Sequence, residues 1–433
     1  MLRAIHPIHY FAFCLAVIYG VLAWFSRQES VLNWQLYAGL TGLAFTLYAF
    51  AYFNTDKVKQ FNATTLIIWS IVFRGLGFWG EPIFEDDYFR YLWDGYHYAT
   101  HGTPYGIAPA AYFSDISVTK ALLPALNQIN HPDLATIYGP SFQLIFLVSY
   151  WLAPGQLWPL KLLLITADLL LIFVLLRLTR PKLVLLYAWN PLVLKEIAFT
   201  AHPDGLIPAL LLGSWYLARQ RHYLAAGLTL AFATATKAST WLLTPFIVLS
   251  IANYSTTFIF ISTYCLLYAP FLLQGATEFS SLQQFYKNFE FNSALYAITQ
   301  LAFQADTAKK LLAILCLSGG LIYFRHFWRQ RPSLDKLPRG DWLFGGLLLA
   351  APVINPWYLL WLLPFACIYP SFCAWFSSAA ICLAYATELN LEAIASAPYQ
   401  HPYWVRPLEF ALIAGAFCVD IFNSKRSHAL VSA

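Results

Sequence analysis

The chain has 433 residues, of which 59% are apolar and only 11% are charged, and its formal net charge at pH 7 is +5. Soluble domains carry about a quarter charged residues, so this composition excludes a soluble protein and indicates a polytopic membrane protein. The charge is small and no basic tail or Lys/Arg run is present, so we expect no nucleic-acid partner.

Apolar segments recur along the whole chain and predict an all-α polytopic bundle of roughly 12 to 14 transmembrane helices, forming one membrane domain over 1–433. Several segments are shorter than the roughly 17 residues that a straight span needs, so we expect broken, tilted or re-entrant helices. The segments lie near residues 8–25, 34–53, 62–79, 139–153, 158–178, 183–200, 204–218, 223–236, 240–253, 256–274, 311–327, 342–354, 357–370, 371–387 and 407–423. The first has no small-residue cleavage site, which favours an uncleaved span over a signal peptide.

Clusters of Lys and Arg between these segments predict the orientation of the chain. The largest cluster falls within 325–339. Placing it and the smaller clusters in the cytoplasm puts the loops 80–138, 275–308 and 388–406 on the non-cytoplasmic side. The number of apolar segments agrees with this orientation only if 139–153 enters the membrane and returns without spanning it. We expect such a re-entrant path.

The seven cysteines lie inside apolar segments, and none falls in the loop 80–138. Their spacing predicts neither a disulfide framework nor a zinc site. We therefore expect them to serve packing, and we assign no metal ligands from the sequence.

The most distinctive segment is the acidic and aromatic stretch 85–95, which reads Glu-Asp-Asp-Tyr-Phe-Arg-Tyr-Leu-Trp-Asp-Gly. Carboxylates at a membrane surface carry a desolvation cost that usually accompanies catalysis or ion binding, although a solvated polar face without chemistry is the alternative. At helical spacing one face is polar and the other aromatic, which predicts an amphipathic interfacial helix with its aromatic side in lipid and its carboxylates towards water or a cleft. The polar face holds Asp87, Arg90, Asp94, His97 and His101, and the aromatic face holds Tyr88, Phe89, Leu92, Trp93 and Tyr96.

Polar residues also interrupt apolar segments later in the chain, which predicts a cavity inside the bundle. They are Lys195, Glu196, His202, Asp204, Lys237, Trp357 and Tyr358. Each has a structural alternative: a hydrogen bond between His202 and Asp204 at a helix start, a self-neutralising Lys195–Glu196 pair, a snorkelling Lys237 and ordinary interfacial aromatic residues.

Several short motifs run in order from about residue 85 to residue 361. They are 87–95, Gly-Thr-Pro-Tyr at 102–105, Thr-Ile-Tyr-Gly-Pro at 136–140, Trp-Asn-Pro-Leu at 189–192 with Glu196, His-x-Asp at 202–204, and Pro-Val-Ile-Asn-Pro-Trp-Tyr-Leu-Leu-Trp at 352–361. As an ordered set they resemble the GT-C superfamily of integral-membrane glycosyltransferases, and most closely the bacterial mannosyltransferases that use a polyprenyl-phosphate sugar donor. Two positions depart from that pattern: Gly139, where a larger residue or Pro is expected, and Asn355, where His is common.

The resemblance implies an inverting transferase that moves a sugar, mannose by analogy, from a polyprenyl-phosphate donor to a hydroxyl of a glycan or lipid acceptor on the non-cytoplasmic face. It places the catalytic base at Asp87, with Asp86 as the reserve. The substrate-binding residues that we expect are Arg90, Tyr91, Asp94, Tyr105, Tyr138, Glu196, His202, Asp204, Lys237, Trp357 and Tyr358.

The expected chemistry needs a base for the acceptor hydroxyl and cations for the departing phosphate. For the phosphate we expect Lys237, Arg90 and Arg74, in that order. No cofactor is required, although the adjacent Asp86 and Asp87 are also compatible with a divalent cation. We expect the loop 275–308 to close over the acceptor.

Two functions from other classes remain open at this stage, namely a lipid-linked sugar flippase or other transporter and an O-antigen-type polymerase. A transporter predicts internal repeats, which we do not find, and a polymerase predicts an Arg-rich external loop, whereas 80–138 holds only Arg90 and Lys120 as basic residues. The transferase is favoured. We expect it in the bacterial inner membrane, among lipids, with its site facing the periplasm.

Overall fold

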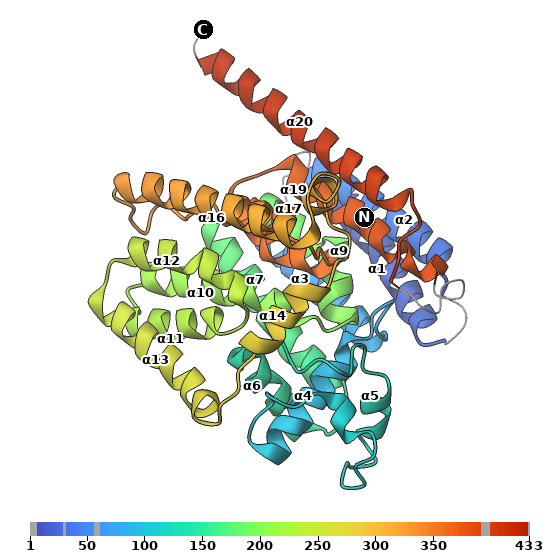
Figure 1. The fold of residues 1–433 in the computed structure, drawn as a ribbon. Coiled ribbons are helices and arrows are strands. Elements are labelled where there is room, and N and C mark those ends of the chain that lie inside the picture. Colours follow the sequence, from blue (N-terminus) through green and yellow to red (C-terminus); the bar gives the residue numbers. More distant parts are fainter. Residues whose placement is uncertain (1–6, 29–31, 56–60, 391–398, 432–433) are drawn as a thin grey trace.

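The computed structural model describes residues 7–28, 32–55, 61–390 and 399–431 (Figure 1). Helices are the main regular elements of the described chain, whose only β contact is an isolated bridge between Phe291 and Val353. The predicted all-α fold is confirmed.

Five helices in the described part of the chain are long and apolar enough to cross a membrane, namely α1 (Pro7–Ser26), α2 (Trp34–Asn54), α7 (Trp158–Leu178), α13 (Tyr254–Leu273) and α16 (Ala305–Arg329). Four shorter apolar helices are α3 (Ala63–Trp79), α6 (Pro140–Leu152), α11 (Tyr223–Thr234) and α17 (Gly340–Ala350). The protein is therefore a polytopic membrane protein, whereas the expected 12 to 14 crossings and the re-entrant path of 139–153 stay predictions.

The remaining helices are mostly short. They are α4 (Asp87–His101), α5 (Leu123–Asn127), α8 (Pro181–Ala188), α9 (Pro191–Leu194), α10 (Leu206–Arg219), α12 (Thr244–Ile251), α14 (Phe279–Asn288), α15 (Leu295–Thr299), α18 (Leu363–Ile368), α19 (Phe372–Ala380) and α20 (Val405–Val431). Local sequence explains many of the starts, because proline occupies the first turn of α6 to α9, where a missing N–H leaves no bond unmade. Asn33, Asn62 and Asn253 begin α2, α3 and α13 by accepting a hydrogen bond from the backbone N–H three residues later.

The helices pack in two groups around a central α7. On one side α1 packs against α2 and α3, and on the other α10, α11 and α13 pack in sequence. Helices α4, α5 and α6 lie together at one end of the bundle, and α16, α17 and α19 lie at the other (Figure 1). Large apolar side chains on α13 and α16 face outward, as lipid contact requires: Leu266 is 70% exposed and Ile322 is 71% exposed.

The surroundings of α4 differ from the expectation of an interfacial helix with its aromatic side in lipid. Leu92, Trp93 and Tyr96 are buried, because the segment that follows α4 folds back and covers them. The covering residues are Tyr112, Val118, Leu122, Ala125, Leu126 and Ile129. That part of the prediction was wrong, since the loop 102–138 supplies a small protein core where lipid was expected.

Helices break at three polar places, as the sequence predicted. A π-helical turn, Lys195–Phe199, is followed by Ala201 at φ 58° and a 3-10 turn, Pro203–Gly205. Further 3-10 turns span Ala238–Leu242 and Pro356–Trp361. These breaks put polar side chains inside the bundle.

Gly139 brings two of these regions together. Its N–H donates to the carbonyl of Thr236 (3.0 Å), and the N–H of Ser141 donates to the carbonyl of Ala235 (3.0 Å). A Cβ at Gly139 would lie 2.4 Å from the carbonyl oxygen of Ala235. The larger residue expected here from the family pattern has no room, and the close approach places the segment before α6 beside the one that carries Lys237.

Candidate active site

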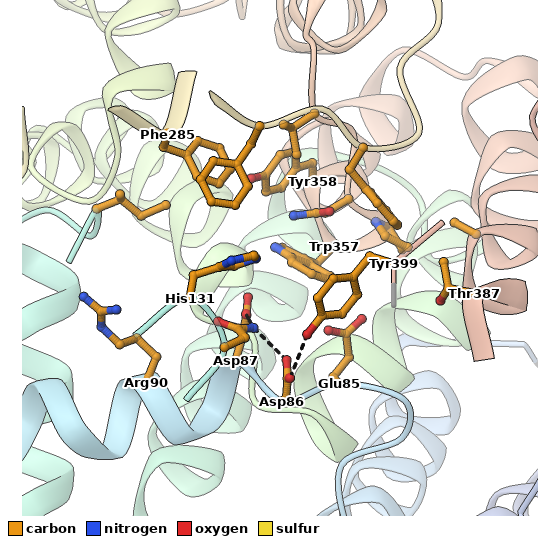
Figure 2. Close-up of a pocket in the computed structure, with 18 of the residues that line it drawn as sticks. Glu85, Asp86, Asp87, Arg90, His131, Phe285, Trp357, Tyr358, Thr387 and Tyr399 are labelled. Atoms are coloured by element: carbon orange, nitrogen blue, oxygen red, sulfur yellow. Dashed lines mark hydrogen bonds between the residues drawn. The ribbon is translucent and has the colours of Figure 1, made fainter. Parts of the chain in front are cut away.

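A cavity of about 580 Å³ opens beside the start of α4. Its walls come from the segments 84–90, 130–138, 285–291, 353–358 and 384–388, together with Lys237 and Tyr399. Figure 2 shows the carboxylates of Glu85, Asp86 and Asp87 on one side of it and the rings of Phe285 and Tyr358 on the opposite side. Residues from both halves of the chain therefore meet in one space.

Asp86 and Asp87 are held by a single amide. Nδ2 of Asn130 donates to Oδ1 of Asp86 (2.7 Å) and to Oδ1 of Asp87 (2.8 Å). The hydroxyl of Tyr399 donates to the other oxygen of Asp86 (3.1 Å) (Figure 2). Both oxygens of Asp86 thus accept hydrogen bonds, whereas the bond from Asn130 to Asp87 uses Oδ1.

The electrostatic environment of Asp87 suits proton transfer. Burial raises the pKa of its carboxyl to about 6. The nearby His202 and the Asn130 hydrogen bond oppose the increase, and the Glu85 and Asp86 carboxylates add to it. A carboxylate that titrates near neutral pH is suited to take a proton from a hydroxyl.

A cation lies in another wall of the cavity. Nζ of Lys237 is 3.0 Å from Oδ1 of Asp204, and the indole N–H of Trp361 donates to the same oxygen (2.8 Å). The ammonium also lies 4.3 Å from the centre of the Tyr358 ring. Lys237 is therefore fixed inside the protein and does not snorkel.

His202 has other partners than the Asp204 considered as an alternative. Its Nδ1 is 3.0 Å from the hydroxyl of Tyr91, and its ring stacks on Trp357 with centroids 3.9 Å apart. The alternative of a His202–Asp204 hydrogen bond is wrong, because Asp204 is engaged by Lys237 and Trp361.

A buried charge cluster lies behind the cavity wall. Nζ of Lys195 is 3.3 Å from Oε1 of Glu196 and 3.6 Å from Oε1 of Glu85. Nε2 of His202 is 3.6 Å from Oε2 of Glu196 and 3.8 Å from Oε2 of Glu85. The Lys195–Glu196 pair considered as an alternative does exist, but it is half of a larger group.

Arg90 and Asp94 connect the helix to the loop. Nε of Arg90 is 2.8 Å from Oδ1 of Asp94, and its NH1 donates to the carbonyl of Leu134 (2.9 Å). The other oxygen of Asp94 accepts from the hydroxyl of Thr136 (2.5 Å) and from Nε2 of Gln143 (2.9 Å). This arrangement ties the segment 134–143 to α4.

The predicted site residues thus fall into two layers. Those that line the cavity are Asp86, Asp87, Arg90, Tyr138, Lys237, Trp357 and Tyr358. Those packed behind it are Tyr91, Asp94, Glu196, His202 and Asp204, all buried. Tyr105 is also buried, and its hydroxyl donates to the carbonyl of Tyr138 (3.0 Å), so it supports a lining residue.

Arg74, which we expected at the lipid phosphate, lies away from the cavity. Its guanidinium pairs with Asp168 of α7 and donates to the carbonyls of Ser70 and Ala188. It is 1% exposed and does not line the cavity, so its expected role at the lipid phosphate was wrong. The reason is a partner 94 residues away that the local sequence does not reveal.

Sequence reasoning missed Glu85, Asn130, His131 and Tyr399, which also line the cavity. Glu85 could have been found, since it opens the acidic run. Nothing local marks Asn130 or Tyr399, because their roles depend on contacts across 44 and 313 residues.

A polytopic all-α bundle with a carboxylate pair and a fixed cation around one internal cavity has the site expected of a membrane glycosyltransferase. The sequence model of a family described as alpha-(1->6)-mannopyranosyltransferase, N-terminal domain (the MptA_B family), matches residues 13–253, more than half of the chain. The chain belongs to this mannosyltransferase family and is a glycosyltransferase. No curated protein and no solved structure matches it.

Proposed function

We propose that the protein transfers a mannosyl residue from a polyprenyl-phosphate donor to a hydroxyl of a glycan or lipid acceptor, on the non-cytoplasmic face of the bacterial inner membrane. The observation that carries this proposal is the shared cavity, in which Asp87, held by Asn130, and Lys237, held by Asp204, both line the walls. The family supports the mannosyl group and, by its description, an α-(1→6) linkage to the acceptor.

Asp87 acts as the base in this reaction. It takes the proton of the acceptor hydroxyl while the acceptor oxygen bonds to the anomeric carbon of the donor sugar. The bond from that carbon to the phosphate oxygen breaks, and its electron pair leaves with polyprenyl phosphate. Attack opposite the leaving group inverts the anomeric centre, so a β-linked lipid mannose gives an α-mannoside.

Lys237 stabilises the leaving phosphate in this proposal. Its ammonium is desolvated and held by Asp204 and the Tyr358 ring, so its charge needs little reorganisation when negative charge develops on the phosphate. Arg90 also lines the cavity, but its charge is shared with Asp94, which makes it the second cation.

The remaining walls suit a sugar. Trp357 and Tyr358 present aromatic rings to the cavity, and Phe285 and Phe289 face it from the segment 279–291. Their position supports the expectation that the loop 275–308 covers the acceptor. The flippase and polymerase alternatives have no comparable support, since the family is one of mannosyltransferases.

The test is transfer of radiolabelled mannose from synthetic polyprenyl-phosphate mannose by the purified chain in detergent. Asp87→Asn is compared with Asp133→Asn, a matched change at an exposed carboxylate of the same loop. We expect release of polyprenyl phosphate from the wild type and the Asp133 variant, and release slowed at least about a hundredfold in Asp87→Asn. Absence of turnover by a folded wild type across a panel of lipid-phosphate sugars would refute the proposal.

A further inference from the structure

The buried cluster behind the cavity has a feature that the transfer reaction does not use. Glu85, Glu196 and His202 each offer one ligand atom, and these atoms all lie within 4.8 Å of one another. Glu85 precedes α4, while the other two come from the helix break at 195–205, so the break and the acidic run converge on one point.

His202 is oriented as a metal ligand would be. It is 1% exposed, and within the described chain its Nε2 has no hydrogen-bond partner. The ring is fixed by Trp357 on its face and by the Tyr91 hydroxyl at Nδ1, which directs Nε2 towards the two carboxylates. Ligating imidazoles commonly have their second nitrogen held by such an outer partner, which sets the tautomer and the ring orientation.

The charges in the cluster do not balance. Two carboxylates face one ammonium, that of Lys195, which approaches the Oε1 atoms and makes no hydrogen bond within the described chain. The Oε2 atoms face His202 instead, at 3.6 and 3.8 Å. A buried negative charge without a counter-charge is costly, so a proton or a cation is needed on the His202 side.

The distances favour a cation. Separations of 3.6 and 3.8 Å between Nε2 and the carboxylate oxygens exceed hydrogen-bond length. Two ligands that each lie about 2.0–2.2 Å from zinc are separated by roughly 3.3–3.6 Å across the ion, so small side-chain shifts would complete the shell.

We propose that Glu85, Glu196 and His202 bind one divalent transition-metal cation, zinc by preference, through Oε2, Oε2 and Nε2. One imidazole with two carboxylates is a ligand set that zinc accepts, and three protein ligands leave one position open. Glu85 also lines the cavity, so the ion is reached from that side. Lys195 competes with the ion for the same two carboxylates.

The proposal is tested on the full-length chain in detergent, without any transfer assay. The protein is stripped with EDTA, dialysed and titrated with Zn²⁺ against a chromophoric chelator, and its bound metal is counted by mass spectrometry. We expect one equivalent in the wild type. Less than about a tenth of an equivalent at micromolar free zinc would overturn the proposal.

Variants then locate the ion. Glu85→Gln and His202→Gln should each weaken zinc affinity at least about tenfold. The side chain of Glu85 is 11% exposed, so this position should tolerate substitution best. His131→Gln, which removes another histidine of the cavity wall, is the matched control and should bind as the wild type does. Equal affinity in all four proteins would place the ion elsewhere and refute the site.

Lys195→Met gives a change of opposite sign. Removing the competing ammonium should tighten zinc binding at least about tenfold, because its positive charge no longer lies beside the two carboxylates. Affinity that stays the same or falls in a folded Lys195→Met protein would show that the ion and Lys195 do not share these carboxylates, which contradicts the proposed ligand set.

Discussion

Lys237 is joined to Asp204 by an ion pair of 3.0 Å inside the bundle, with Asp204 fully buried and the lysine side chain 11% exposed. Removing one partner of such a pair leaves an uncompensated charge, which costs about 3–5 kcal/mol, whereas removing both costs less. We expect Asp204→Asn to lower the melting temperature more than the double change Asp204→Asn/Lys237→Met. A double variant less stable than either single variant would contradict this account.

Lys237→Ala should affect the donor more than the acceptor, because the proposal places its ammonium at the lipid phosphate. We expect the apparent KM for polyprenyl-phosphate mannose to rise at least about tenfold, with a smaller change for the acceptor. Steady-state kinetics with each substrate varied in turn measure this. Equal effects on both substrates would assign Lys237 to helix positioning alone.

Asp87→Asn should reduce kcat by about 10²–10⁴-fold, the usual contribution of a general base. Folding should be preserved, since asparagine can still form a hydrogen bond with Asn130. Asp86→Asn is expected to lose less, because both oxygens of Asp86 already accept hydrogen bonds from the protein. A larger loss at Asp86 than at Asp87 would exchange their roles.

The pH dependence follows from the burial of Asp87, which raises its pKa to about 6. A base must be ionised, so kcat/KM should rise with pH and level off above this value. The profile is best measured in chelator, so that no bound cation shifts it. Asn130→Ala removes a hydrogen bond that lowers this pKa and should therefore move the midpoint upward. A midpoint near 4, the ordinary value of an aspartate, would argue against Asp87 as the titrating group.

Gly139→Ala should destabilise the protein and reduce activity, because its Cβ would lie 2.4 Å from the Ala235 carbonyl, two residues before Lys237. Gly75→Ala is the matched control, since nothing lies within 4 Å of a Cβ there and alanine favours the helix. The melting temperatures and the transfer rates of the two variants, each compared with the wild type, test this expectation. A Gly139→Ala protein with normal stability would mean that the two segments separate easily.

The sequence was sufficient for what depends on composition and local pattern. Low charge and recurrent apolar segments predicted the polytopic α-helical class. Prolines with polar neighbours predicted the helix breaks that carry His202 and Trp357, and a lysine between two short apolar pieces predicted the break at Lys237. The acidic run was expected to face water or a cleft, and residues 85–87 line the cavity. Such features can be predicted because helix length, helix breaks and charge density each depend on residues that lie close together in the sequence.

What failed depended on partners distant in the chain. The aromatic face of α4 is covered by residues 112–129, and an amphipathic pattern alone does not say whether protein or lipid covers it. Arg74 was the third candidate for the lipid phosphate, and nothing in the sequence indicated its actual partner, Asp168, which stands alone in an apolar segment. Asn130 and Tyr399 carry no pattern that distinguishes them from ordinary loop residues.

The backbone bridge at Phe291 holds one wall of the cavity in place independently of the side chains that line it. The N–H of Phe291 donates to the carbonyl of Pro352 (3.0 Å), and the carbonyl of Phe291 accepts from the N–H of Ile354 (2.8 Å). The cavity-lining segment 285–291 is therefore joined through the backbone to the segment that leads into Trp357. These bonds do not depend on side-chain identity. Substitutions within 285–290 would therefore change the lining of the cavity without removing the two backbone hydrogen bonds.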